Sequence, residues 1–594
     1  MKLIFRLAVI SKHLPIHNTI LTSLKKLFLP SFSRTCLQVM ATAAIAREQS
    51  SAAHSSHSLL EKLPNGAQHL GSAATRPSLS SVSRVNSFRS NVSLSSTNAA
   101  AMLSKRSASP QRSLSCSPAR ANDVRVELRN LNSSAQLHNN NKISRFGEPT
   151  IYSSVLCYLR RGVSFVISFS FLGSLMTAAI VQHSLDKFKS SYRYIRGSPP
   201  PRRPFAAIER QRALKRTKKD KKVVRDIQYY ASLVGLHATK YEVVTDDGFI
   251  LQLFRITDPS VPDEQLKTRY PVLLIHGLLQ SAGAFCVNEE DSLAFYLCKS
   301  GYDVWIGNNR CGFEHKHLKY SYNDPRMWDW DITDMGTRDL PAFIDHIQAH
   351  TKYEKIALAC HSQGTAQAFL ALSRYHTPEL GQKISVFCAI APAVYAGPLV
   401  DQSFFKFIRY LPDSVHRLIF GIHAYIPAMI NLRLMLPKSA LTFCSYMMFH
   451  FLFGWSDTRW DRALEGRMFQ FSPVYISSES MRWWLGKDGF ATRRCIFKRD
   501  DADEAWFDAR CPPFALWVAG RDSLVNGDRL IQRLENAEPN VVVVKKEVLD
   551  EYEHLDVLWA IDAVDHVHRG IKEVIWSTAW KREHCQCPVG CEEL

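Results

Sequence analysis

Three side chains that together could perform nucleophilic catalysis occur in this chain in a recognisable order. The first, Ser362, lies in the hexapeptide ACHSQG (359–364), after the strand-like run KIALA and before the helical pattern TAQAFLALSRY. A strand, a tight turn and a helix form a nucleophile elbow, in which small residues must flank the strained turn. Because a serine hydroxyl is a poor nucleophile near neutral pH, it needs a base, and the base needs an acid that orients it.

The candidate acid and base each follow an apolar run that is typical of a strand. Asp522 comes after residues 514–519 and a glycine turn, and His554 comes after residues 541–544. Catalytic groups gather at the ends of strands in open α/β sheets. We therefore predict that Asp522 fixes the tautomer of His554, which takes the proton from Ser362.

Two other acids lie close to this pair. Asp528 is six residues past Asp522, and Asp556 is two residues past His554. Asp522 is preferred because it directly follows its strand and glycine turn. Asp556 is expected to orient the loop or to cap a helix.

An oxyanion hole requires two backbone N–H groups near the nucleophile. One comes from the residue after the serine, here Gln363, and the other from an early strand-to-helix loop. The sequence IHGLL (275–279) follows a strand-like run and supplies Leu278 at the corresponding place. We therefore predict the N–H groups of Leu278 and Gln363 as oxyanion donors.

The elements around these residues indicate an α/β fold. Residues 241–244 and 249–256 alternate in polarity around an Asp-Asp-Gly turn, which predicts a hairpin. Short apolar runs at 272–275, 302–306 and 355–359 then alternate with helical patterns. Strands that alternate with helices predict a mostly parallel sheet flanked by helices.

The motifs together resemble the acid-lipase branch of the α/β-hydrolases, which includes gastric and lysosomal lipases and fungal steryl ester hydrolases. The resemblance covers roughly residues 226–580 and includes PVLLIHGLLQS, GYDVWIGNNRCG, the ACHSQG elbow, LWVAGRDSLV and YEHLDVLWAID in the family's order. It implies Ser362, Asp522 and His554 as the triad, and Leu278 and Gln363 as oxyanion donors. The chain departs from the family pattern at two cysteines. Cys360 replaces the first glycine of the elbow, and Cys311, before Gly312, follows Arg310 where the family usually has glycine.

The stretch from about 395 to 480, between the elbow and the acid, is strongly apolar. A second membrane helix at 439–455 is conceivable, but an inserted helical cap with apolar inner walls fits better, because long acyl or steryl groups need a large greasy cavity. Met435, Met447 and Met448 can adapt their shape to such a ligand. The pair Trp328 and Trp330 is interpreted as core packing.

A membrane segment precedes this domain. Residues 163–181 carry no charge, and as a helix they would just cover the roughly 30 Å core of a bilayer. They can span a membrane or form a hairpin in the monolayer of a lipid droplet. Residues 187–225 then carry 15 Lys and Arg, which favours a cytosolic catalytic domain beside anionic lipid. The droplet, the endoplasmic reticulum and the plasma membrane all remain candidate locations.

The N-terminal region has a different composition. Residues 51–120 hold 20 serines with few large apolar residues, which predicts disorder, and Arg-Ser groups there resemble kinase substrates. Residues 1–47 contain no acid and fit a mitochondrial transit peptide, a membrane-lying stretch, or a segment upstream of a true start at Met40 or Met102. The expected organisation is a disordered region at 1–160, a membrane segment at 161–183, a linker at 184–225 and the hydrolase domain at 226–594.

The distribution of charge argues against a nucleic acid partner. The whole chain has a net charge of +19, but residues 1–150 carry 19 basic against 5 acidic side chains and residues 151–230 carry 17 against 4. Residues 231–594 are therefore acidic, whereas a phosphate-binding surface should lie on the folded domain. Near the C-terminus, His584, Cys585, Cys587 and Cys591 could form half of a metal site or a palmitoylated tail, but a loose cytosolic tail is the favoured interpretation.

The sequence therefore predicts a membrane-anchored lipid ester hydrolase that needs no metal or organic cofactor. Steryl esters are the first expected substrate. Triacylglycerols are the alternative, because an apolar cap would accept either class. An inactive hydrolase fold that serves as an interaction protein is the alternative of a different class, and the intact triad order disfavours it.

Overall fold

A computed structural model describes residues 144–148, 150–197, 202–310, 312–498, 500 and 504–594. The serine-rich region, the candidate kinase sites and residues 1–47 lie outside the described residues. Cys311 lies outside them as well.

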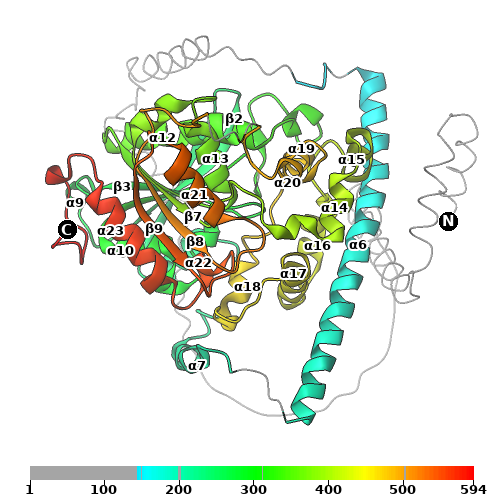
Figure 1. Cartoon of the computed structure of the whole chain (residues 1–594), viewed down its shortest axis with the longest axis horizontal. Helices are drawn as coiled ribbons and strands as arrows, with labels where there is room; N and C mark the ends of the chain where they lie inside the picture. The colour runs from blue at the N-terminus through cyan, green and yellow to red at the C-terminus, as the bar shows by residue number, and fades with distance from the viewer. Residues whose placement is uncertain (1–143, 149, 198–201, 311, 499, 501–503) are drawn as a thin grey trace, which may run out of the picture. The chain divides into compact units, whose positions relative to one another are not determined.

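A nine-stranded, mostly parallel sheet forms the centre of the catalytic domain (Figure 1). Its order is β1-β2-β4-β3-β6-β7-β8-β9, and β5 pairs with β2 at the side of this path. The pairs from β4 through β3, β6, β7 and β8 to β9 are parallel, and β2 is antiparallel to β1, β4 and β5. The strands are β1 (His237–Val244), β2 (Phe249–Thr257), β3 (Pro271–Ile275), β4 (Asp303–Asn308), β5 (Lys316–His317), β6 (Ile356–His361), β7 (Ile384–Ile390), β8 (Phe514–Ala519) and β9 (Val543–Leu549).

The central strands are buried on both sides, which explains why they read as continuous apolar runs. Successive side chains of a strand point to opposite faces, so Leu273 and Ile275 of β3 join one core while Val272 and Leu274 join the other. The first core includes side chains of α12, α13 and α21, and the second includes those of α8, α10 and α23. This arrangement holds the strand ends that carry the candidate site.

The helices fall into three groups. Those around the sheet are α8 (Ile227–Leu233), α9 (Asp263–Leu266), α10 (Leu293–Ser300), α11 (Ile332–Asp334), α12 (Leu340–Thr351), α13 (Gln363–Leu372), α21 (Gly527–Ala537), α22 (Asp556–Trp559) and α23 (Arg569–Ser577). Those inserted between β7 and β8 are α14 (Ser403–Arg409), α15 (Asp413–Phe420), α16 (Pro427–Met435), α17 (Lys438–Phe453), α18 (Glu465–Met468), α19 (Ser478–Leu485) and α20 (Phe490–Arg493). Before the domain come α6 (Ile151–Ile195) and α7 (Ala206–Lys215).

The inserted helices are the predicted cap, and they lie together on one side of the sheet (Figure 1). Helix α17 includes most of the stretch that was conceivable as a second membrane span, and its side chains Met448, Phe449, Leu452 and Phe453 face the cavity above Ser362. It is therefore a wall of the cap. Of the three methionines expected to adapt to a ligand, Met448 lines this cavity, whereas Met435 is 68% exposed and Met447 is buried elsewhere.

Helix α6 contains the apolar stretch 163–181, but it is much longer than that stretch. Residues 151–160, expected in the disordered region, and residues 184–195, expected in the linker, are also helical. A capping box between Thr150 and Ser153 starts the helix. Among the described residues, α6 is the one helix long and apolar enough to cross a membrane, with a mean hydropathy of 1.9 over its most apolar window.

The C-terminal segment is packed against the domain, so the expectation of a loose tail is wrong. The N–H of Gln586 donates to the carbonyl of Thr268, and the N–H of Val589 donates to that of Ser300, each at 2.8 Å. Cys591 is buried. These contacts fix the segment beside α10, which sequence spacing alone does not reveal.

Candidate active site

Ser362 lies on a strained turn between β6 and α13. Its backbone has φ 52° and ψ −117°, a conformation that costs an L-residue free energy and that raises the side chain above the end of the sheet. The turn leaves no room at the second small position, because a Cβ on Gly364 would lie 2.6 Å from the carbonyl oxygen of Ile275. Sequence and structure agree on this strand, turn and helix.

The structure brings the three predicted side chains into one hydrogen-bonded line. Nε2 of His554 lies 2.7 Å from Oγ of Ser362, and Nδ1 of His554 lies 2.5 Å from Oδ2 of Asp522. The other carboxylate oxygen, Oδ1, accepts the N–H of Leu524 at 2.8 Å. The side chains of His554 and Asp522 are each 2% exposed, so their contact is shielded from water.

The two alternative acids lie elsewhere. Asp528 is exposed in the first turn of α21. Asp556 is buried and begins α22, where its carboxylate accepts the N–H of Glu553 and the indole N–H of Trp460, each at 2.8 Å. Burial, above all, raises the pKa of Asp556 to about 7. Asp556 therefore fixes the loop that carries His554, which is the role expected from the sequence.

The loop after β3 runs directly against the elbow. A Cβ on Gly277 would lie 3.1 Å from the Cβ of Ser362. Leu278 and Gln363 both line the cavity above Ser362. Gln363 is the first residue of α13, and the first N–H groups of a helix lack intrahelical acceptors. Both candidate oxyanion donors are therefore near the hydroxyl.

Gln280 and His361 brace this loop, a role that sequence reasoning missed. Oε1 of Gln280 accepts the N–H of Gly277 and contacts Nδ1 of His361, each at 3.1 Å. The other ring nitrogen of His361 lies 3.2 Å from the carbonyl oxygen of His554. Burial, followed by the nearby His554, holds the pKa of His361 well below its usual value. A neutral imidazole carries a single N–H, so His361 donates to only one of these two oxygens. Its ring lies between the loop of Gly277 and the loop of the candidate base.

We expect Gln280→Ala to lower kcat by about 10- to 100-fold, because a displacement of about 1 Å in such a site can cost about 100-fold. The substitution removes the acceptor for Gly277 and leaves the oxyanion loop free to shift. Steady-state kinetics on one ester would measure the change, with the exposed Gln532→Ala in α21 as the matched control. If both variants had the same kcat, the brace would have no role.

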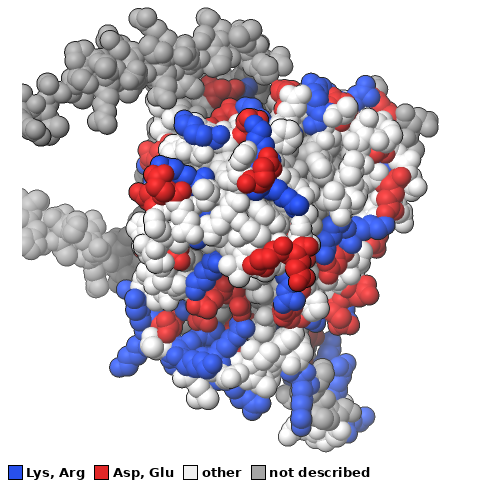
Figure 2. Space-filling model, turned by 90° about the vertical axis from the view of Figure 1, so that its left-hand side faces the viewer, with Lys and Arg blue, Asp and Glu red and all other residues white. Residues whose placement is uncertain are grey.

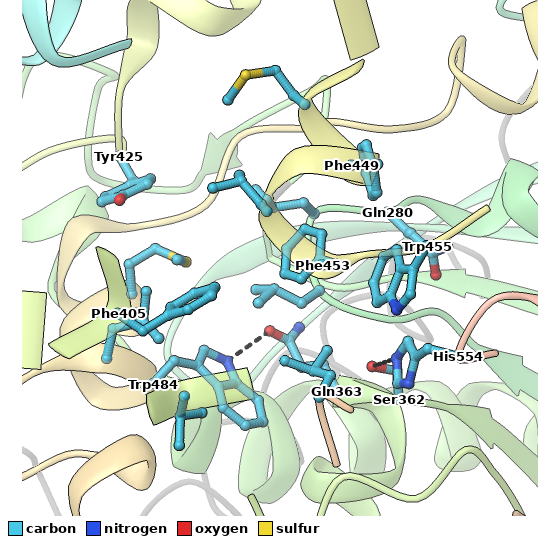
Figure 3. A pocket seen from close by; sticks show the side chains of 18 of the residues that line it. Gln280, Ser362, Gln363, Phe405, Tyr425, Phe449, Phe453, Trp455, Trp484 and His554 are labelled. Carbon is cyan, nitrogen blue, oxygen red and sulfur yellow. Dashed lines mark hydrogen bonds between the residues drawn. The ribbon is translucent and has the colours of Figure 1, made fainter. Parts of the chain in front are cut away.

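Aromatic side chains connect the cap to the site. The indole of Trp455 stacks on the imidazole of His554, with ring centroids 5.2 Å apart and an 8° interplanar angle, and Phe453 stacks on Trp455 at 4.3 Å. The indole N–H of Trp484 donates to Oε1 of Gln363 at 3.1 Å (Figure 3). These aromatic residues are evident in the sequence, but nothing there places Trp455 on His554 or Trp484 on Gln363.

The cavity above Ser362 is enclosed almost entirely by apolar side chains (Figure 3). Its walls include Phe404, Phe405, Phe449, Phe453, Met481 and Leu485 from the cap. Ser362 and His554 lie at its floor. The arrangement presents a hydroxyl, hydrogen-bonded to a base, to a greasy ligand. Trp328 and Trp330 do not line it, and both are buried in the core beside α11, as interpreted from the sequence.

Two family models and several known proteins match this chain. The family described as "alpha/beta hydrolase fold" matches residues 270–561, and the "partial alpha/beta-hydrolase lipase region" matches residues 227–289. Sterol esterase 2 of Saccharomyces cerevisiae is 39% identical over 391 residues, which are 60% of this chain and 72% of the relative. Gastric triacylglycerol lipase of Mus musculus is 32% identical over 57% of this chain and 88% of its own length.

The chain belongs to the acid-lipase branch of the α/β-hydrolases. As a member of this branch it is a carboxylic ester hydrolase of the lipid-ester class.

One departure from the acid-lipase pattern is explained by the structure. Cys360 is fully buried at the end of β6, in register with Ile275 of β3 and Ala389 of β7. Burial raises the pKa of its thiol well above the usual value, so it stays a neutral packing group. The turn is built with this side chain in place, and the substitution removes none of the side chains of the site.

Proposed function

We propose that this acid-lipase relative is a membrane-anchored hydrolase that cleaves steryl esters at Ser362 through an acyl-enzyme. The observation that carries this proposal is the line Asp522–His554–Ser362 at the floor of an apolar cavity. A serine, an oriented imidazole and a shielded carboxylate are the parts that acyl transfer needs. Apolar walls suit an ester whose acyl and alcohol parts are both greasy.

In the first step, Oγ of Ser362 attacks the ester carbonyl carbon while Nε2 of His554 takes the hydroxyl proton. The N–H groups of Leu278 and Gln363 donate to the oxyanion of the tetrahedral intermediate. The bond to the alcohol oxygen then breaks, and His554 returns its proton to that oxygen, so that the sterol leaves and the fatty acyl group stays on Ser362.

In the second step, water attacks the acyl carbon and gives its proton to Nε2 of His554. Collapse of this second intermediate breaks the bond to Oγ, which regains the proton, and the fatty acid leaves. The carboxylate of Asp522 keeps the Nδ1 proton of His554 in place and stabilises the imidazolium that forms in each step.

Anchoring by α6 is part of the proposal. Its apolar stretch 163–181 has the length of a bilayer core, and basic residues follow it in the chain. These basic residues favour the cytosolic side for the catalytic domain. A lipid droplet, the endoplasmic reticulum and the plasma membrane are the candidate surfaces.

The choice of substrate rests on similarity. Sterol esterase 2 is named for steryl esters and is 39% identical, whereas the gastric triacylglycerol lipase is 32% identical. The apolar cavity accepts both chemical classes. Triacylglycerols are therefore the second candidate substrate of the same site.

A substrate panel tests the proposal. We expect the purified full-length chain in detergent micelles to hydrolyse cholesteryl oleate with a higher kcat/KM than triolein, measured as fatty acid released. Faster hydrolysis of triolein would reverse the order of the substrates. Hydrolysis of neither ester, without labelling by a fluorophosphonate probe, would instead support an inactive interaction protein.

A further inference from the structure

One face of α6 packs against the cap instead of facing lipid. The buried residues Ser164, Ser168, Leu172 and Ala179 recur at intervals of four and seven, which places them on one side of the helix. Oγ of Ser164 donates to the carbonyl of Leu418 in α15 at 2.8 Å. Figure 1 shows α6 running alongside the cap helices. The stretch expected to cross a membrane is thus also part of the catalytic domain.

This face of α6 also forms a wall of the cavity above Ser362. Phe171, Leu172 and Leu175 line the cavity together with cap side chains. Phe171 stacks on Phe404 of α14 with ring centroids 5.7 Å apart, and its edge meets Phe420 at 5.5 Å. A ligand bound at Ser362 would therefore touch the same helix that is proposed to anchor the protein.

The opposite face of α6 is exposed and mostly apolar. Val163 and Val166 are 44% and 64% exposed, and Ile180 and Val181 are 46% and 52% exposed. The exposed hydroxyls of Ser174 and Thr177 on this face donate to backbone carbonyls one turn earlier in the helix. A large exposed apolar surface of this kind marks contact with lipid or another apolar partner. By contrast, Figure 2 shows acidic and basic side chains mixed across the side of the domain seen from the left of Figure 1, away from α6. If lipid covers the exposed face of α6, this helix alone separates the lipid from the cavity.

The contacts along α6 differ between its N-terminal part and the cavity wall. Polar contacts lie before the wall, where Ser164 bonds to Leu418, Arg161 to Asn323, and Cys157 to His423. At Phe171, Leu172 and Leu175, the contacts that line the cavity are between apolar side chains. Lipid can replace apolar contacts without leaving a polar group unpaired. The contact between α6 and the cap can therefore open at the cavity wall while the N-terminal part of α6 stays attached to the cap.

The cavity must widen to admit its ligand. Its free volume is about 170 Å³, below the roughly 300–1,000 Å³ of sites that hold drug-sized ligands. A steryl ester is larger than such ligands. Because β3, β6 and the elbow form the floor of the cavity, we expect it to widen by movement of the cap and of α6.

We propose that α6 is both a wall of the substrate cavity and the gate through which lipid esters enter it. The ester passes from the lipid phase between α6 and the cap helices α14 and α17, and the side chains of Leu172 and Leu175 contact it when bound. This inference rests on the proposed hydrolysis at Ser362. It adds that the membrane helix takes part in selecting the substrate.

The test compares long and short esters in variants of one wall residue. In Leu175→Trp, we expect kcat/KM for cholesteryl oleate in micelles to fall by about tenfold or more, while that for p-nitrophenyl acetate changes by less than about twofold. The small ester reaches Ser362 without filling the cavity. The control Val166→Trp adds the same indole on the exposed face and should keep both values.

A second variant covers the case in which the bulky indole disturbs folding. If Leu175→Trp lost both activities equally, Leu175→Ala would decide, because a widened wall should change the ratio of long-ester to short-ester kcat/KM by about threefold or more. A wild-type ratio in Leu175→Ala, or equal effects of Leu175→Trp and Val166→Trp, would overturn the gate. If the wild-type protein hydrolysed neither ester, the proposed hydrolysis at Ser362 would itself be wrong.

Discussion

Ser362→Ala is expected to slow ester hydrolysis by about 10⁶-fold, the scale found when a triad nucleophile is removed. The variant keeps the backbone turn but has no atom that can form the acyl-enzyme. Stability should change little, because the side chain loses one hydrogen bond, worth about 1 kcal/mol, to His554. Fatty acid release from cholesteryl oleate and labelling by a fluorophosphonate probe would both measure the loss.

Ser373→Ala is the matched control. Ser373 follows the same helix α13, is fully buried and donates its hydroxyl to the carbonyl of Leu370. It should keep activity and labelling. The double variant Ser362→Ala/His554→Ala should be no slower than Ser362→Ala, because the base has no function without its nucleophile. Probe labelling that survived in Ser362→Ala would mean that another residue is the nucleophile.

The elements that position the candidate site were predictable because their signals are local. A buried parallel strand reads as a short apolar run, and a strained turn demands small neighbours, so the elbow at Ser362 and the loop at Leu278 could be placed from a few residues each. Asp522 and His554 could then be chosen because each directly follows a predicted strand. The structure brings these side chains within hydrogen-bonding distance.

Contacts between distant elements were not predictable. The apolar stretch 163–181 has the same composition whether lipid surrounds it or the cap covers one side. Only the fold reveals that Leu172 and Leu175 reach the cavity. Likewise, Trp455 reads as one more apolar residue of the cap, and its stacking on His554 depends on where α17 ends. The C-terminal cysteines carried no signal that their segment packs on α10.

The cap, the candidate base and α6 form one connected structure. Phe453 and Trp455 continue from the end of α17 onto the imidazole of His554, while Phe171 joins α6 to α14. A cap that moved to admit a ligand would therefore change the packing on His554 as well.

Asp522→Asn is expected to lower kcat by about 10⁴-fold with little change in KM or in stability, as in triads where the acid is neutralised. The carboxylate now faces three donors, the Nδ1–H of His554 on one oxygen and the N–H groups of Leu524 and Val525 on the other. An amide offers one acceptor oxygen and one NH₂ group, so either orientation sets a donor against a donor. If the NH₂ faces His554, the ring proton moves to Nε2, which then cannot accept the proton of Ser362.

Two matched variants separate this effect from a general loss of acidic side chains, with kcat on one ester and thermal unfolding measured for all three. Asp528→Asn changes an exposed residue of α21 and should retain wild-type kcat. Asp556→Asn should reduce stability or shift the loop of His554 without reaching a 10⁴-fold loss, since Asp556 bonds to Glu553 and Trp460. If Asp556→Asn instead caused the larger loss in kcat, Asp556 would be the acid that orients the base, and the role assigned to Asp522 would be wrong.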